Sequence, residues 1–294
     1  MDKIIVITDS NSGISPAVAS NMGIGVIAMP FVIDGETYYE KEDISDEKFY
    51  EALEKKLKIS TSQPAVGSLY ACWQKYLEHY DQLIYIPMSS ALSNSYETAV
   101  MLASQPEFMD KVYVVDNRRI SLTQTESVKD ALYLIKKGYH AKTIKEILDS
   151  DAKQSVIYLM VNDLDYLKRG GRISKTASIV GTTLNIKPIL SIKGEKLEFY
   201  GRAHGMKQAI KKMEDALEND MRTTFAVLKK TGNLKVGLAY TKADEKLIAT
   251  VKESLQKRFP DLPFIEGPIT MSIACHTGPN AIGVGLVKSY DILR

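Results

Sequence analysis

Short apolar segments alternate with longer amphipathic ones along the first half of the chain. The apolar segments are rich in Ile and Val and have the length of buried β-strands; they cover residues 3–8, 83–87 and 112–115. The amphipathic segments carry apolar residues at helical spacing, often after a Ser or Thr cap or a Pro in the first turn. These predicted helices start near Ser15-Pro16 and Thr61-Ser62-Gln63-Pro64, and also cover about 46–58, 96–104 and 122–137. Strands that alternate with helices predict a mostly parallel sheet with helices on both faces.

The second half of the chain has a different pattern. Residues 188–192 and 196–202 flank Lys193-Gly194-Glu195, which predicts a β-hairpin. The other predicted strands are 155–161, 234–241, 269–274 and 281–287, and the predicted helices are 163–169, 206–229 and 244–259. We therefore predict an α/β protein of two domains with a boundary near Gln154. Residues 1–154 form the parallel domain and residues 155–294 a smaller α/β domain with a mixed sheet.

Composition and charge narrow the function classes. The chain has 294 residues, of which 45% are hydrophobic and 25% charged, as in ordinary globular proteins. A net charge of +2 excludes a general attraction to nucleic acid or to an anionic membrane. Cys72 and Cys275 have neither disulfide-framework nor zinc-site spacing, and residues 23–28 fit a dinucleotide pattern without opening a helix. We expect a cytoplasmic protein without metal, cofactor or integral membrane contact.

Hydroxyl side chains gather where the predicted strands end and helices begin. Backbone N–H groups at a helix start, together with neighbouring hydroxyls, can bind a carboxylate or another anion. The same residues are also the preferred helix caps, so each one alone is explained by capping. The candidates are Ser10, Ser12, Thr61, Ser62, Ser89, Ser90 and Ser93.

Five segments resemble those of the DegV family of bacterial lipid-binding proteins. They are Thr8-Asp9-Ser10, Thr61-Ser62-Gln63-Pro64, the loop 89–96, the run 166–174 with Gly170-Gly171-Arg172, and His276-Thr277-Gly278-Pro279. The order of these segments is that of the family, and they extend from residue 8 to residue 279. Each segment is weak evidence alone, but the joint order is specific.

The resemblance implies a two-domain α/β protein that holds one long-chain fatty acid between its domains. It also implies that a separate fatty acid kinase phosphorylates the bound acid for phospholipid synthesis, so that the protein is a carrier and not an enzyme. By the same resemblance, Thr61 and Ser93 bind the carboxylate, with Ser62 and His276 close by. Arg172 lies near the entrance and Arg202 contacts the kinase. Asn94 and Gly278 complete the implied ligand-binding set.

Three positions depart from the family pattern. Asn94 and Asn280 replace the usual glycines, and Asn is the residue that best replaces Gly in a left-handed conformation. We therefore expect the same backbone at both positions. Ala203 follows Arg202, where the family more often has Thr. This last departure lies next to the residue that the resemblance assigns to the kinase contact.

Two other functions remain open from the residues alone. The first is a hydrolase or phosphoryl-transfer enzyme that acts on an acyl substrate through the loop 9–12 and His276. Against it, no clustered acidic metal site is visible, and Asp9 is equally explained as a loop cap. The second is a scaffold whose cavity is incidental.

Overall fold

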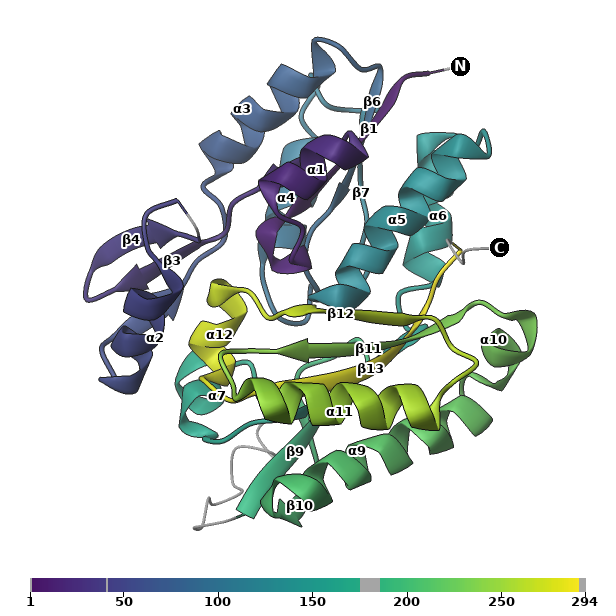
Figure 1. The fold of residues 1–294 in the computed structure, drawn as a ribbon. Coiled ribbons are helices and arrows are strands. Elements are labelled where there is room, and N and C mark those ends of the chain that lie inside the picture. The colour runs from purple at the N-terminus through teal and green to yellow at the C-terminus, as the bar shows by residue number, and fades with distance from the viewer. Residues whose placement is uncertain (1, 41, 175–185, 291–294) are drawn as a thin grey trace.

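The computed structural model describes residues 2–40, 42–174 and 186–290. Its strands form three sheets (Figure 1). The first sheet has the order β2-β1-β6-β7 and is parallel throughout, as predicted. Its strands are β1 (Ile4–Asp9), β2 (Gly25–Ile27), β6 (Gln82–Ile86) and β7 (Val112–Val114).

Helices cover both faces of the parallel sheet, because successive strand residues point to opposite sides. On one face, Val6 and Ile84 pack against residues of α1, α5 and α6. On the other face, Ile5 and Tyr85 pack against α3 and α4, including Trp73. The five helices are α1 (Pro16–Met22), α3 (Val66–Leu77), α4 (Ser95–Ala103), α5 (Leu122–Lys136) and α6 (Ala141–Ser150).

A small antiparallel sheet, which sequence analysis missed, projects from the parallel one. It has the order β4-β3-β5, with β3 (Pro30–Ile33), β4 (Glu36–Tyr39) and β5 (Ile59–Thr61), and α2 (Asp46–Glu54) packs on it. Asp34 and Gly35 form the β3–β4 turn with φ of 50° and 94°. Asp-Gly is the sequence signal for such a tight hairpin, so this element was predictable. The helix capped by Ser45 ends at Glu54, short of the predicted residue 58.

The third sheet is mixed, as predicted, and has the order β10-β9-β8-β13-β11-β12. Among the strands that the structure describes in this sheet, only β11 and β12 pair in parallel. The strands are β8 (Ser155–Met160), β9 (Ile186–Ile192), β10 (Glu198–His204), β11 (Leu234–Tyr240), β12 (Phe264–Pro268) and β13 (Ile282–Lys288). Helices α9 (Gly205–Arg222) and α11 (Glu245–Arg258) cover one face of this sheet, and its other face is turned toward the parallel half (Figure 1).

Two of the expectations for the second half are wrong. Residues 269–274 do not form a strand: Met271–Thr277 form helix α12, because Met271, Ala274 and Cys275 at helical spacing pack against Phe31 and Phe49 of the small sheet and α2. The helix expected over 206–229 is divided into α9 and α10 (Ala226–Thr231), and Phe225 between them is buried in the core. The short helix α7 (Asp165–Gly170) and the β9–β10 hairpin are confirmed.

The strands of the parallel sheet all precede residue 115, and those of the mixed sheet all follow residue 154. A domain boundary near Gln154 stays a prediction, because α12 returns to pack on the small sheet. Among the helices of the described residues, none is both long and apolar enough to cross a bilayer.

Candidate functional site

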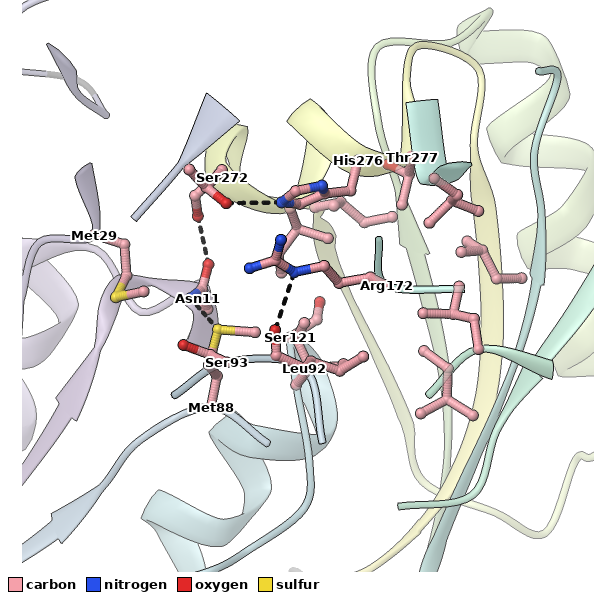
Figure 2. A pocket seen from close by; sticks show the side chains of 18 of the residues that line it. Asn11, Met29, Met88, Leu92, Ser93, Ser121, Arg172, Ser272, His276 and Thr277 are labelled. Atoms are coloured by element: carbon pink, nitrogen blue, oxygen red, sulfur yellow. Dashed lines mark hydrogen bonds between the residues drawn. The ribbon is translucent and has the colours of Figure 1, made fainter. Parts of the chain in front are cut away.

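A cavity lies between the parallel half and the face of the mixed sheet that is turned toward it. It contains about 860 Å³ of space between atoms, part of it open to solvent. Apolar side chains form most of its wall, namely Met29, Met88, Leu92, Ile120, Ile157, Leu159, Leu167, Ile192, Leu197, Ala239, Ile269 and Ile273. Figure 2 shows polar groups of Asn11, Arg172, Ser272 and His276 gathered toward one side of the cavity. The cavity therefore has a polar end and a mostly apolar remainder.

His276 and Thr61 form the polar end, although they are 215 positions apart along the chain. His276 lies in the last turn of α12 and Thr61 at the end of β5, and the Nε2 and Oγ1 atoms are 2.8 Å apart. Burial, and secondarily the charge of Arg172, lowers the pKa of His276 to about 4. The imidazole is therefore neutral at neutral pH.

Gly170 sets the position of this imidazole. A Cβ atom at Gly170 would lie 2.0 Å from Nδ1 of His276, which is an impossible contact. Nδ1 itself is buried and has no hydrogen-bond partner among the described residues. The glycine at the end of α7 thus allows the ring to pack directly against the backbone.

Arg172 brings a positive charge to the cavity wall. Its Nε donates to the Leu92 carbonyl at 3.1 Å and its Nη1 to the Gly170 carbonyl at 2.6 Å. Within the described ranges, no carboxylate pairs with this guanidinium. A buried or half-buried charge without a countercharge is costly, so this position favours an anionic ligand.

The structure brings five of the predicted residues to one cavity: Thr61, Ser62, Ser93, Arg172 and His276 all line it. Ser93 shares a hydrogen bond with the Ser95 hydroxyl at 2.8 Å and also accepts from the Ser95 N–H. Ser62 is exposed at the margin.

The other three predicted residues lie outside the lining. Asn94 is exposed at the start of α4 with a φ of −79°, so the expected left-handed conformation is wrong there, whereas Asn280 has a φ of 60° and adopts it. Gly278 packs against Tyr166, where a Cβ would lie 2.6 Å from Cδ2. Arg202 is exposed on β10, with its guanidinium 5.7 Å from the centre of the Phe199 ring.

Sequence analysis missed several polar residues of the cavity, among them Asn11 and Ser272. The Asn11 amide donates to the Met88 sulfur at 2.8 Å, and the Ser272 hydroxyl donates to the Asn11 carbonyl oxygen (Figure 2). Ser272 and His276 lie one turn apart on α12 and both reach the cavity. Had residues 271–277 been predicted as a helix, the four-residue spacing would have placed Ser272 and His276 on the same face.

The contacts of Asp9, a candidate catalytic residue under the enzyme hypothesis, are those of a structural residue. Its side chain is fully buried and accepts hydrogen bonds from the Met88 N–H, the Asn11 N–H and the Gln124 amide. Burial raises the pKa of Asp9 to about 6, although these hydrogen bonds lower it. Ser12 is also fully buried and donates to the Asp9 carbonyl. Neither residue lines the cavity, so the loop 9–12 offers no accessible nucleophile there.

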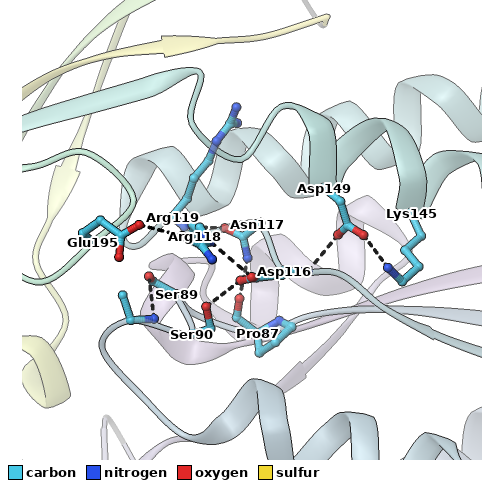
Figure 3. A network of polar contacts seen from close by, with 11 residues as sticks. Pro87, Ser89, Ser90, Asp116, Asn117, Arg118, Arg119, Lys145, Asp149 and Glu195 are labelled. Carbon is cyan, nitrogen blue, oxygen red and sulfur yellow. Dashed lines mark hydrogen bonds and ion pairs between the residues drawn. The ribbon is translucent and has the colours of Figure 1, made fainter.

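A polar network ties the two halves together beside the cavity (Figure 3). Asp116 accepts from the Ser90 hydroxyl at 2.7 Å and pairs with Arg118, whose Nη1 is 2.7 Å from Glu195 Oε1. Glu195 lies in the β9–β10 turn, and the residues on either side of this hairpin line the cavity. The candidate hydroxyl of Ser90 therefore serves this network and not the cavity.

No group of three or more His, Cys, Asp or Glu side chains within the described ranges is arranged to hold a metal ion. Burial raises the pKa of the Cys275 thiol. The imidazole of its neighbour His276 is hydrogen-bonded to the Thr61 hydroxyl. The chemistry of the site is thus that of hydrogen-bond donors around an apolar cavity.

Fold and site together define an α/β protein with a deep, mostly apolar small-molecule cavity. The chain belongs to the DegV family, whose model, described as "Uncharacterised protein, DegV family", matches residues 3–289. A DegV domain-containing protein of Listeria innocua is 30% identical over 96% of this chain and 98% of its own length.

Two solved structures extend the comparison. A DegV family protein from Thermus thermophilus, described by its fatty acid binding, has a TM-score of 0.83 and 26% identity and covers 97% of this chain and 99% of its own. DegV of Bacillus subtilis, described as a fatty acid binding protein, has a TM-score of 0.81 and 27% identity and covers 98% of this chain and 100% of its own. The fold is therefore that of the fatty-acid-binding members of the family.

Proposed function

We propose that this protein binds one long-chain fatty acid in the cavity between residues 1–154 and 155–294. The observation that carries the proposal is the asymmetry of the cavity. One side has hydroxyls, an imidazole and a guanidinium that pairs with no carboxylate of the described residues, and the remainder is mostly apolar. The descriptions of the Thermus thermophilus and Bacillus subtilis proteins support the same ligand class.

The head group is proposed to lie against Thr61, Ser93 and His276, with Arg172 as the nearby positive charge. Neutral donors hold a carboxylate through charge-assisted hydrogen bonds. The neutral imidazole donates from one nitrogen without forming an ion pair that would withdraw the oxygens from later chemistry. The acyl chain contributes most of the affinity, at ~0.8 kcal/mol for each buried methylene.

We further propose that the protein presents the bound acid to a separate fatty acid kinase and has no catalytic activity of its own. Arg202 is the proposed partner contact. It is exposed, it does not line the cavity, and no ion pair within the described ranges involves it. Substituting Arg202→Ala should lower phosphorylation by the kinase while leaving fatty acid affinity unchanged.

Mass spectrometry of an organic extract from the natively purified protein tests the ligand class. We expect a fatty acid at close to one molecule per chain. The double variant Thr61→Ala/Ser93→Ala should bind added fatty acid at least tenfold more weakly, since each lost hydrogen bond to a charged group costs about 1.5–3 kcal/mol.

The matched control is Ser104→Ala/Thr250→Ala, which removes two exposed helix hydroxyls bonded to backbone carbonyls. Equal affinity of the two double variants would contradict the head-group assignment. Absence of lipid in the extract, followed by no binding of added acids, would contradict the ligand class itself.

A further inference from the structure

A second, smaller cavity continues the first along the mixed sheet. It contains about 310 Å³ of space between atoms, part of it open to solvent, and is lined almost entirely by apolar groups. Four residues border both cavities: Ser121, Ile157, Ala239 and Gly283. The start of α5 forms the roof of the second cavity through Leu122 and Thr123.

The floor of this passage carries few side chains because the strand register brings glycines together. On β13, Gly283 pairs with Leu159 on one side and Ala239 on the other. Two residues further, Gly285 pairs with Ile157 and Gly237. Glycine inside a strand weakens the sheet and marks a place where another group approaches the backbone closely.

These glycines are all on the face turned toward the parallel half. Their strand neighbours Ile282, Val284 and Leu286 point the other way, into the core under α9 and α11. The side chains are therefore missing only on the face of the sheet that lines the cavity. The two glycine rows are separated by ~7 Å, since a strand rises ~3.4 Å per residue.

Beyond the second row the three strands carry side chains again. The next register row consists of Ser155, Val287 and Lys235. Lys235 Nζ is 2.7 Å from Glu126 Oε2, and both side chains of this ion pair are buried. An acyl chain cannot readily displace a buried ion pair, because separating the pair would leave two uncompensated charges.

We infer that the second cavity is the subsite for the methyl end of the longest acyl chains, and that Gly283 sets the chain length that can enter it. This inference rests on the proposed binding of a fatty acid. A chain whose head group lies at His276 crosses the first cavity and passes over Gly283. Its end then lies on the glycine floor before Val287.

Gly283 is the position where the passage can be narrowed without disturbing the sheet. A Cβ there would meet Leu159 Cδ1 at 3.6 Å, Ile157 Cγ2 at 3.7 Å and the Ala239 carbonyl at 3.8 Å, all ordinary contacts. At Gly285 the same atom would lie 2.7 Å from the Val156 carbonyl, so that position would move the backbone. Gly283→Val therefore fills the opening with a residue that strands favour.

The test is the affinity of wild type and Gly283→Val for a homologous series of saturated acids, from decanoic to arachidic acid. We expect the short acids to bind both proteins equally. Beyond the length that reaches Gly283, the variant should lose about fourfold in affinity for each excluded methylene, the fold-change that corresponds to ~0.8 kcal/mol. Gly201→Ala on β10, where a Cβ would meet nothing within 4 Å, is the matched control.

The outcomes are separable. If wild type binds none of the acids, the proposed function fails and this inference fails with it. If wild type binds them but Gly283→Val binds every length as wild type does, or weakens all lengths equally, the subsite alone is refuted. Should Gly283→Val fail to fold, Ala239→Val narrows the same opening from β11, and the same length-dependent loss is expected.

Discussion

Protonation of His276 should destabilise the protein as the pH falls, and this is a sharp test of the site geometry. The folded-state pKa of about 4 lies below the ordinary value of 6.5, because the ring is buried and Arg172 is near. Between these two values the unfolded chain binds a proton at His276 and the folded chain does not. Stability is therefore fully present above pH 6.5 and is lost as the pH falls toward 4.

The size of the effect follows from the two pKa values. Each unit of difference corresponds to ~1.4 kcal/mol, so about 2 kcal/mol of the free energy of unfolding is lost between pH 7 and pH 5 through this one group. Asp9 and Asp130 work in the opposite direction, because burial raises each pKa to about 6. Their contribution to stability is greatest at low pH and is lost as the pH rises through 6.

Comparison with His276→Gln isolates the effect of the imidazole. The two aspartates and the remaining histidines are present in both proteins, so their pH dependence cancels in the difference. The measurement is urea unfolding of both proteins from pH 7 to pH 5, with the difference in free energy plotted against pH. The wild type should lose ~2 kcal/mol more than the variant over this interval.

Parallel pH profiles for the two proteins would refute the reasoning. They would mean that His276 takes up its proton in the folded state near its ordinary pKa. In that case the polar end of the cavity is hydrated, and the imidazole is not the neutral hydrogen-bond partner described above.

Two further predictions concern single contacts. Gly170→Ala should displace the imidazole of His276 and weaken fatty acid binding about tenfold, whereas Gly67→Ala, with nothing within 4 Å of the new Cβ, should leave affinity unchanged; equal affinities would contradict the close packing of Gly170. Lys235→Met should lower the free energy of unfolding by ~3 kcal/mol, because it leaves the buried Glu126 carboxylate with fewer partners. Adding Glu126→Gln should restore part of that loss in denaturant unfolding; a double variant no more stable than Lys235→Met would show that the charge is not the cause.

Local pattern predicted the elements whose burial is uniform. The parallel strands are continuous apolar runs, and their character does not depend on which neighbour covers them. The Ser15 and Ser45 caps were equally local, since a hydroxyl needs only the N–H three residues ahead. The Asp34-Gly35 turn was just as local, and the small sheet could have been found from it.

Helix α12 shows where local pattern fails. Apolar and polar side chains alternate from Ile269 to Ile273, and this is the pattern of a half-buried strand. The helix is decided by Phe31 and Phe49, which are far away along the chain and offer a surface to Met271 and Cys275. Only the helical conformation brings Ser272 and His276 to the same cavity.

The sequence by itself determined the mostly parallel and mixed sheets and the hydroxyl-rich junctions between strands and helices. These depend on residue type and spacing within one element. The tertiary structure alone decided which junctions meet. Ser93 and Thr61 reach the cavity, whereas Asp9, Ser12 and Ser90 are committed to other contacts. Burial, pKa and the shape of an apolar passage are set by atoms from distant segments, so only packing in three dimensions fixes them.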